Sequence, residues 1–257
     1  MKKTLFTLAI AVATLASCTS DDSGNSTPPA GSTGTLLKQV IDTYEDGSTS
    51  TYDFTYDGNK LTSWVIDAGT ADVETITYTY TNGLLTAVDT DLIDAVDDNS
   101  KVVTYDASNK LLSITKTSSV GGVTQTNYVY NANGTITANE GGVATTTYTI
   151  LNGNIVEEAF VSGVDNETRV VDFDTKNGFF KNIHQTETLS LLNDIYTVYN
   201  TANNETSITV TGTNVFSDET YTVSYTYSSN DYPVTSTRIE APGTADEETI
   251  TSTYTYY

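Results

Sequence analysis

The stretch Thr51-Tyr52-Asp53-Phe54-Thr55-Tyr56-Asp57-Gly58-Asn59-Lys60-Leu61-Thr62-Ser63-Trp64 decides the fold of this 257-residue chain. Successive side chains of a strand point to opposite faces, so Tyr52, Phe54 and Tyr56 share one face and polar residues share the other. Asp57-Gly58 accepts the positive φ angles that a tight hairpin turn requires. The stretch therefore predicts two antiparallel strands with one aromatic face and one polar face.

The same unit recurs along the chain. The segment 75–88 repeats it with Asn82-Gly83 as its turn, and the step from Tyr56 to Tyr80 is 24 residues. Further copies are predicted at 103–114, 128–136, 148–156, 171–183, 196–208 and 221–239, with a last strand at 251–257. A repeat of roughly 25 residues with this pattern indicates a structure in which neighbouring units bury one another's apolar faces.

The predicted fold of residues 35–257 is one all-β domain, an antiparallel up-and-down meander of about 16–18 short strands. A sheet of that width is expected to curl or to close into a barrel. The aromatic face would fill the concave core and the threonine-rich face would meet water. No segment of the body shows a sustained helical period.

The N-terminus predicts export. Lys2 and Lys3 precede an apolar run from Leu5 to Leu15, which is shorter than the roughly 20 residues of a spanning helix. Residues 1–17 therefore have the form of a signal peptide. The run ends in Leu15-Ala16-Ser17-Cys18, which resembles the lipobox of bacterial lipoproteins. That resemblance implies a diacylglyceryl lipid on Cys18, the one cysteine of the chain, and anchoring in the outer membrane. A plain signal peptide followed by an incidental cysteine is the alternative.

Residues 18–34 are rich in Ser, Thr, Gly and Pro, so they predict a flexible tether between the lipidated cysteine and the domain. Ser20-Asp21-Asp22 resembles the acidic surface-export signal of Bacteroidota-type lipoproteins and implies exposure on the cell surface. A plain polar linker explains this run equally well, and a periplasmic orientation stays open.

The body also resembles the tyrosine-rich hairpin-repeat domains of Bacteroidota-type lipoproteins. It is more distantly similar to the YD repeats of RHS-type proteins, through Tyr56-Asp57-Gly58-Asn59-Lys60-Leu61 and Tyr105-Asp106-Ala107. Later copies depart from the Tyr-Asp pair. The resemblance implies a structural shell or an interaction surface and no general catalytic motif.

The charge of the chain excludes one class of partner. It carries 11 basic and 33 acidic residues, and removal of residues 1–17 takes away two lysines, giving 9 − 33 = −24. Such a chain repels phosphate backbones, so we expect no nucleic-acid partner. An acidic chain of this kind is expected to be soluble and to present a solvated acidic face.

Few residues predict chemistry. His184 is the only histidine, and its predicted place at a strand end favours a structural role. The chain has no Gly-x-Ser-x-Gly motif and no phosphate-binding loop, and one cysteine with one histidine cannot form a Cys/His zinc site. We therefore predict no enzyme activity, no catalytic residue, no cofactor and no metal. The segment 89–99 holds five aspartates that suit Ca²⁺, but its spacing is not that of an EF-hand, and a solvated acidic loop is favoured.

The leading interpretation is a non-catalytic binding or structural module of the cell envelope with a glycan or a protein as its partner. Tyrosines at strand period favour core positions over sugar stacking, and Trp64, in phase with Ile66, also predicts a core residue. One alternative is an extracellular polysaccharide hydrolase that uses paired carboxylates. Another is an outer-membrane β-barrel, because 252–257 alternates and ends on an aromatic residue; a lipid-facing apolar row is missing from that segment.

Overall fold

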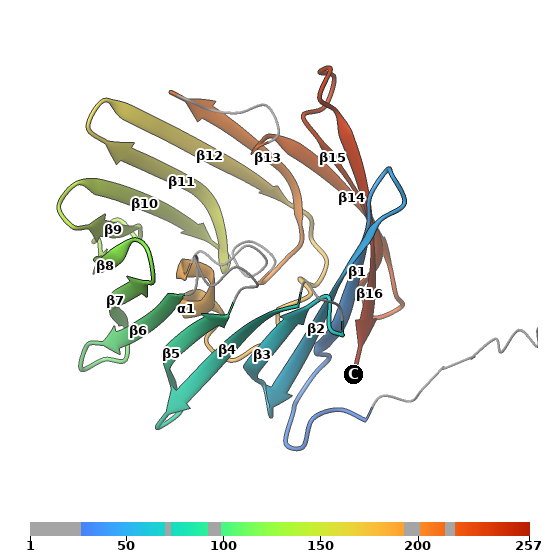
Figure 1. Cartoon of the computed structure of the whole chain (residues 1–257), viewed down its shortest axis with the longest axis horizontal. Coiled ribbons are helices and arrows are strands. Elements are labelled where there is room, and N and C mark those ends of the chain that lie inside the picture. The colour runs from blue at the N-terminus through green and yellow to red at the C-terminus, as the bar shows by residue number, and fades with distance from the viewer. Residues whose placement is uncertain (1–26, 70–72, 92–98, 193–200, 214–218) are drawn as a thin grey trace, which may run out of the picture.

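The computed structural model describes residues 27–69, 73–91, 99–192, 201–213 and 219–257. Within these ranges the chain forms a closed barrel of sixteen antiparallel strands that follow one another in sequence order (Figure 1). The all-β meander predicted from the hairpin repeat is confirmed, and the sheet closes. The strands are β1 Leu37–Thr43, β2 Thr49–Asp57, β3 Lys60–Ile66, β4 Glu74–Thr81, β5 Leu84–Asp91, β6 Asn99–Tyr105, β7 Leu111–Ser118, β8 Gly122–Tyr130, β9 Ile136–Glu140, β10 Ala144–Leu151, β11 Asn154–Ser162, β12 Asp165–Phe173, β13 Glu205–Gly212, β14 Tyr221–Tyr227, β15 Pro233–Glu240 and β16 Glu248–Tyr256.

Closure of the barrel joins the first described strand to the last. β1 pairs with β16, with Val40 opposite Tyr254, and the backbone N–H of Tyr257 donates to the carbonyl oxygen of Leu36 at 3.0 Å. Each of the described strands therefore has a hydrogen-bonded neighbour on both sides. A closed ring removes the unpaired edges that would otherwise recruit another chain.

The hairpin turns and bulges explain why the sheet closes. Asn82 and Gly83 have φ angles of 52° and 83°, which is the pair of positive values that a two-residue hairpin turn needs. A register shift falls just before this turn, between Thr79 and Tyr80, and shifts recur at matching places in the hairpins β2–β3, β6–β7 and β14–β15. Bulges increase the local twist of a sheet, and their repetition supplies curvature.

The two faces of the wall have the predicted composition. The inward side chains of β2 and β3 are aromatic and buried: Phe54 is 1% exposed and Trp64 2%, and their rings meet edge to face at 5.8 Å. The core role predicted for Trp64 and for most strand tyrosines is confirmed. The alternate positions of β2, such as Asp53 and Thr55, lie on the outer face.

The lumen is filled by a segment that the repeat did not predict. After β12, residues 174–192, here called the plug, run through the barrel and include the short helix α1, Thr186–Leu191, which lies inside the ring of strands (Figure 1). The hairpin copy predicted at 171–183 is therefore wrong, because only its first residues belong to β12. The copy predicted at 196–208 lies partly outside the described residues, and its described part enters β13 only at Glu205.

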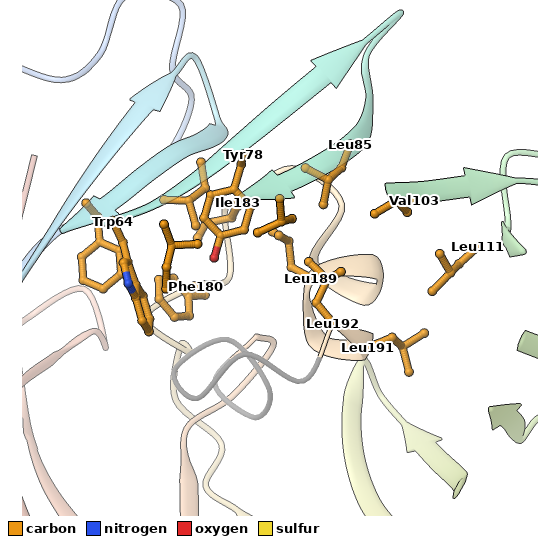
Figure 2. Packing of buried hydrophobic residues seen from close by; sticks show 14 of the residues in the cluster. Trp64, Tyr78, Leu85, Val103, Leu111, Phe180, Ile183, Leu189, Leu191 and Leu192 are labelled. Carbon is orange, nitrogen blue, oxygen red and sulfur yellow. The ribbon is translucent and has the colours of Figure 1, made fainter. Parts of the chain in front are cut away.

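The physical reason for the plug is the width of the barrel. A wall of about eight strands can fill its interior with its own side chains, whereas sixteen strands leave a wide lumen. Phe180, Ile183, Leu189, Leu191 and Leu192 of the plug are at most 6% exposed. Figure 2 shows them gathered with wall residues such as Tyr78 and Leu85.

Helices in the described ranges are too short or too polar to cross a membrane. The predicted signal peptide at 1–17 lies outside the described residues, as does Cys18. Of the predicted tether at 18–34, only residues 27–34 are described.

Candidate functional site

The two ends of the barrel differ. The short turns between β2 and β3, β4 and β5, and β6 and β7 lie at one end, here called the closed end, where the plug contacts the first two of these turns. The opposite end, which carries the turns 44–48, 119–121, 141–143 and 163–164, is called the open end. Leu36 and Tyr257 meet at the closed end.

His184 belongs to the plug and not to a strand, which corrects its predicted position. The plug has no alternating pattern that could continue the sheet, and it turns into the lumen instead. Nε2 of His184 lies 2.7 Å from the carbonyl oxygen of Gly83, and its backbone N–H donates to the carbonyl oxygen of Asn59 at 2.8 Å. Gln185 accepts a hydrogen bond from the backbone N–H of Leu85 at 2.7 Å. These bonds hold the plug against two hairpin turns.

The other end of the plug is fixed to the wall on the side of β6 and β8. The hydroxyl of Tyr128 donates to the carbonyl oxygen of Leu191 at 3.0 Å, and Nζ of Lys101 donates to the carbonyl oxygen of Leu192 at 3.2 Å. A lysine is favourable there because unsatisfied carbonyl groups make the end of a helix electronegative. The last residues of α1 therefore have a defined position in the lumen.

A cavity of about 330 Å³, here called the lumen cavity, lies between this end of the plug and the wall formed by β6 to β11. Its lining combines apolar side chains, threonine hydroxyls and three charged groups. The lining residues are Lys101, Ile114, Lys116, Thr124, Thr126, Tyr128, Ala138, Glu140, Ala144, Thr146, Tyr148, Phe160, Leu191 and Leu192. A concave site of mixed lining and this size is typical of small-molecule binding.

Strand register places the charges of the lumen cavity toward the open end. Lys101 of β6 lies directly opposite Lys116 of β7, which lies opposite Thr124 of β8. The row nearer the closed end is Tyr128, Ala138, Thr146 and Phe160, in that order across β8 to β11. The charged residues therefore lie in the part of the cavity nearer the open end, here called its entrance, and the row of Tyr128, Ala138, Thr146 and Phe160 lies in the part nearer the closed end, here called its base.

The charge of the lumen cavity contrasts with that of the chain. Lys101 and Lys116 face the single lining carboxylate, Glu140, in a protein with a formal charge of −22. Burial raises the pKa of Tyr128 and Tyr148 well above its usual value, and nearby Glu158 adds to the shift of Tyr148. Both phenols are therefore neutral hydrogen-bonding groups at physiological pH.

Sequence reasoning missed the two lysines, although a signal was present. Lys101 is in phase with Val103 and Tyr105, so strand alternation places it on the inward face. Thr124 and Thr126 are in phase with Tyr128 in the same way. A lysine in phase with inward strand residues of an acidic chain is the sequence signal that indicated these two cavity-lining lysines.

A second depression lies at the open end, between the β1–β2 and β15–β16 turns. It is lined by Tyr44, Glu45, Asp46, Ser48, Asp246, Glu247 and Glu248. Hydrogen bonds from the side chain and backbone of Ser48 lower the pKa of Asp46, whereas a general acid needs a raised pKa. Glu45 and Glu247 already accept hydrogen bonds from backbone N–H groups.

The segment 89–99, whose five aspartates suit Ca²⁺, is described only in part. Asp89 and Asp91 belong to β5, and residues 92–98 lie outside the described residues. Within the described ranges, no group of three or more His, Cys, Asp or Glu side chains is placed to hold a metal ion.

The fold and the lumen cavity define the chain as a closed, plugged, sixteen-stranded antiparallel barrel in its described part. Among solved structures it is similar to a porin-like protein from Bacteroides uniformis ATCC 8492, with a TM-score of 0.54 and 12% sequence identity. The likeness covers 87% of this chain and 99% of that chain. At this identity the similarity concerns the fold. Comparison with protein-family models and with curated proteins gives no match.

Proposed function

We propose that this chain is a non-catalytic binding protein of the cell envelope, held at the outer membrane by a lipid on Cys18, with a barrel that stands in water and receives a ligand in its lumen. The observation that carries this proposal is the direction of the two faces of the wall. The aromatic side chains point inward and the threonine side chains point outward.

The outer face suits water. In β4 and β16 the outward positions are all threonine: Thr75, Thr77, Thr79, Thr81, Thr249, Thr251, Thr253 and Thr255. The outward positions of β2 include Asp53 and Asp57. A wall that faces lipid needs an apolar band about 25 Å tall. Outward apolar residues occur here, such as Val102 and Val129, but threonines and carboxylates interrupt them around the barrel.

The proposed anchor gives the barrel an orientation. The described chain reaches β1 at the closed end, where the backbone N–H of Thr33 donates to Asn59 at 2.7 Å and Asn182 donates to the carbonyl oxygen of Thr35 at 2.8 Å. A tether from Cys18 would therefore hold the closed end toward the membrane. The open end and the entrance of the lumen cavity would then face away from it.

A second candidate is an outer-membrane β-barrel that spans the bilayer. It is favoured by the closure of the sheet, by the even number of strands in the described chain and by the fold likeness to a porin-like protein. It is also favoured by short turns at the end where Leu36 and Tyr257 meet. Its described strands contain 5 to 9 residues, as in β9 and β2, and a spanning strand needs about 9–11. Its lumen is also occupied by the plug.

The hydrolase interpretation has less support. A glycoside hydrolase needs two carboxylates that converge on one cleft. Of the described residues that line the lumen cavity, only Glu140 carries a carboxylate. The acidic depression at the open end supplies carboxylates, but Asp46 there has a lowered pKa.

Cell fractionation tests the proposal. The native chain is compared with a variant in which residues 1–18 are replaced by a secretory leader that ordinary signal peptidase removes. We expect the native chain in the membrane fraction and the variant in the soluble fraction without detergent. A variant that stays in the membrane and needs detergent for extraction would establish the spanning barrel instead.

A fatty-acid label tests the anchor separately. We expect label on the native chain and none on Cys18→Ala. Label on Cys18→Ala would show that the lipid is elsewhere.

A further inference from the structure

We propose that the lumen cavity binds a small anionic amphiphile, a molecule with one acidic group and a compact apolar body. The inference rests on the proposed role of the lumen as a binding site, and it is independent of the lipid on Cys18. The acidic group would lie beside Lys101 and Lys116, and the apolar body would lie against the end of the plug and the wall of β8 to β11.

The lysine pair supplies the anion-binding part of the site. Lys101 and Lys116 are direct cross-strand neighbours on the inward face. Lys101 is only 9% exposed and already donates to the carbonyl oxygen of Leu192, which fixes its position. Lys116 forms no hydrogen bond or ion pair with the described residues, so its ammonium group can bind a ligand.

The base of the cavity supplies the apolar part. Ala138, Leu191 and Leu192 are at most 5% exposed, and Ile114 and Phe160 complete the apolar lining. The hydroxyl of Tyr128 is occupied by the carbonyl oxygen of Leu191. Threonines 124, 126 and 146 also line the cavity, and their hydroxyls can donate to the oxygen atoms of an acidic group.

The volume of the lumen cavity limits the size of its ligand. A volume of about 330 Å³ is at the low end of the roughly 300–1,000 Å³ of small-molecule sites. The site therefore fits a molecule of the size of a bicyclic aromatic acid or a medium-chain fatty acid.

Calorimetric titration with matched probes tests the assignment. The full lipidated chain is placed in lipid nanodiscs, with empty nanodiscs as the blank, and is titrated with 2-naphthoate and with the uncharged 2-naphthamide. We expect 2-naphthoate to bind at least tenfold more tightly. Equal binding of the two probes would overturn the anion assignment and leave lumen binding intact. Failure of both probes to bind would overturn the assignment and count against the binding role, whereas the anchor is tested by the fatty-acid label.

Charge variants locate the anion. Lys116→Gln should weaken 2-naphthoate binding about tenfold and leave 2-naphthamide unchanged, and Lys116→Arg should keep most of the affinity. The matched control is Lys181→Gln, which removes an exposed lysine bound to Asn177 at the closed end and should change neither affinity. An equal loss in Lys116→Gln and Lys181→Gln would show that only the overall charge matters, and the assignment would fail.

Volume variants locate the apolar body. Ala144→Phe, near the entrance of the lumen cavity, should abolish binding of 2-naphthoate. Ala159→Phe, on the outer face of β11, is the control and should bind as the native chain does. Emission of Trp64, the only tryptophan, reports whether each variant is folded. Unchanged binding by a folded Ala144→Phe variant would place the ligand outside the lumen.

Discussion

Asn59 and Asn182 are hydrogen-bonded across the closed end of the barrel: the side-chain amide of Asn59 lies 2.5 Å from the carbonyl oxygen of Asn182. The contact joins the β2–β3 turn to the plug, 123 residues later. Asn182 also donates to the carbonyl oxygen of Thr35 and to the hydroxyl of Tyr232. Through its backbone carbonyl and its side chain, Asn182 thus connects the segment before β1 with two hairpin turns.

We therefore expect Asn182→Ala to lower the free energy of unfolding by about 1–3 kcal/mol, because it leaves two acceptors without their donor. Urea unfolding followed by Trp64 emission measures the loss. The control Asn139→Ala changes an outward residue of β9 whose contact to Thr145 is long, 3.4 Å, and should stay within about 0.5 kcal/mol. Equal losses of unfolding free energy in Asn182→Ala and Asn139→Ala would mean that the hydrogen bonds of Asn182 stabilise the barrel no more than the long contact of Asn139 does.

The plug should also stabilise the barrel through its apolar residues. Phe180 is 2% exposed and its ring lies 5.4 Å from that of Phe54 and 4.8 Å from that of Phe179. We expect Phe180→Ala to cost about 3–5 kcal/mol, because it removes a buried ring and leaves a void. Val161→Ala, at an outward position that is 51% exposed, is the control and should be nearly neutral. A small loss for Phe180→Ala would show that the barrel is stable without a filled lumen.

Close approach of the backbone makes any side chain at Gly212 destabilising. Gly212 has a φ of 148°, and a Cβ there would lie 2.1 Å from the carbonyl oxygen of Asn166. We expect Gly212→Ala to cost about 2–5 kcal/mol through backbone strain and collision. Gly243 also has a positive φ, 77°, but open space around it, so Gly243→Ala should cost only about 1–2 kcal/mol. Thermal unfolding of the two variants compares them, and a larger loss for Gly243→Ala would contradict the geometry.

The buried tyrosines predict alkaline instability. Burial, together with the nearby Asp42, raises the pKa of Tyr254 from 10.0 to about 12, while a hydrogen bond with Ser236 opposes the shift. Below pH 10 this phenol is protonated in both states and its contribution is fully present. As the pH rises from 10 toward 12, only the unfolded state loses the proton, so stability falls by about 1.4 kcal/mol per pH unit for each such tyrosine.

Urea unfolding between pH 8 and pH 12 measures this slope. Tyr254→Phe removes one titrating group and should make the slope shallower, whatever it does to stability at pH 8. A stability that is constant up to pH 12 would contradict the raised pKa. Tyrosinate absorbance at each pH provides an independent record of the titration.

Local sequence signals predicted the wall of the barrel well. The alternation around Tyr52, Phe54 and Tyr56 determines which face is buried, and Asn82-Gly83 determines where a hairpin turns. Both features depend on residues within one hairpin, so they can be predicted from the local sequence pattern. Closure depends on the summed twist and bulges of sixteen strands, which is why the sequence left a curled and a closed sheet open.

The plug and the lumen cavity could not be predicted in the same way. Val171 and Phe173 continue the strand pattern and favour a hairpin over 171–183, yet Phe180 packs against Phe54, more than 100 residues earlier, and Phe179 packs against Tyr254 of the last strand. That choice depends on the width of the closed barrel and not on local propensity. The lysine pair was missed because Lys101 and Lys116 become neighbours only when β6 and β7 pair.

The pairing of β1 with β16 imposes an order on biogenesis. Val40 finds its partner Tyr254 only after the whole intervening chain has been synthesised. Until then the first strand remains an open edge that can template aggregation, and such long-range closure makes the last folding step slow. Loss of β16 would expose β1 and β15 together, so a nonsense mutation in the codons of β16 should be as damaging as one in the codons of β8.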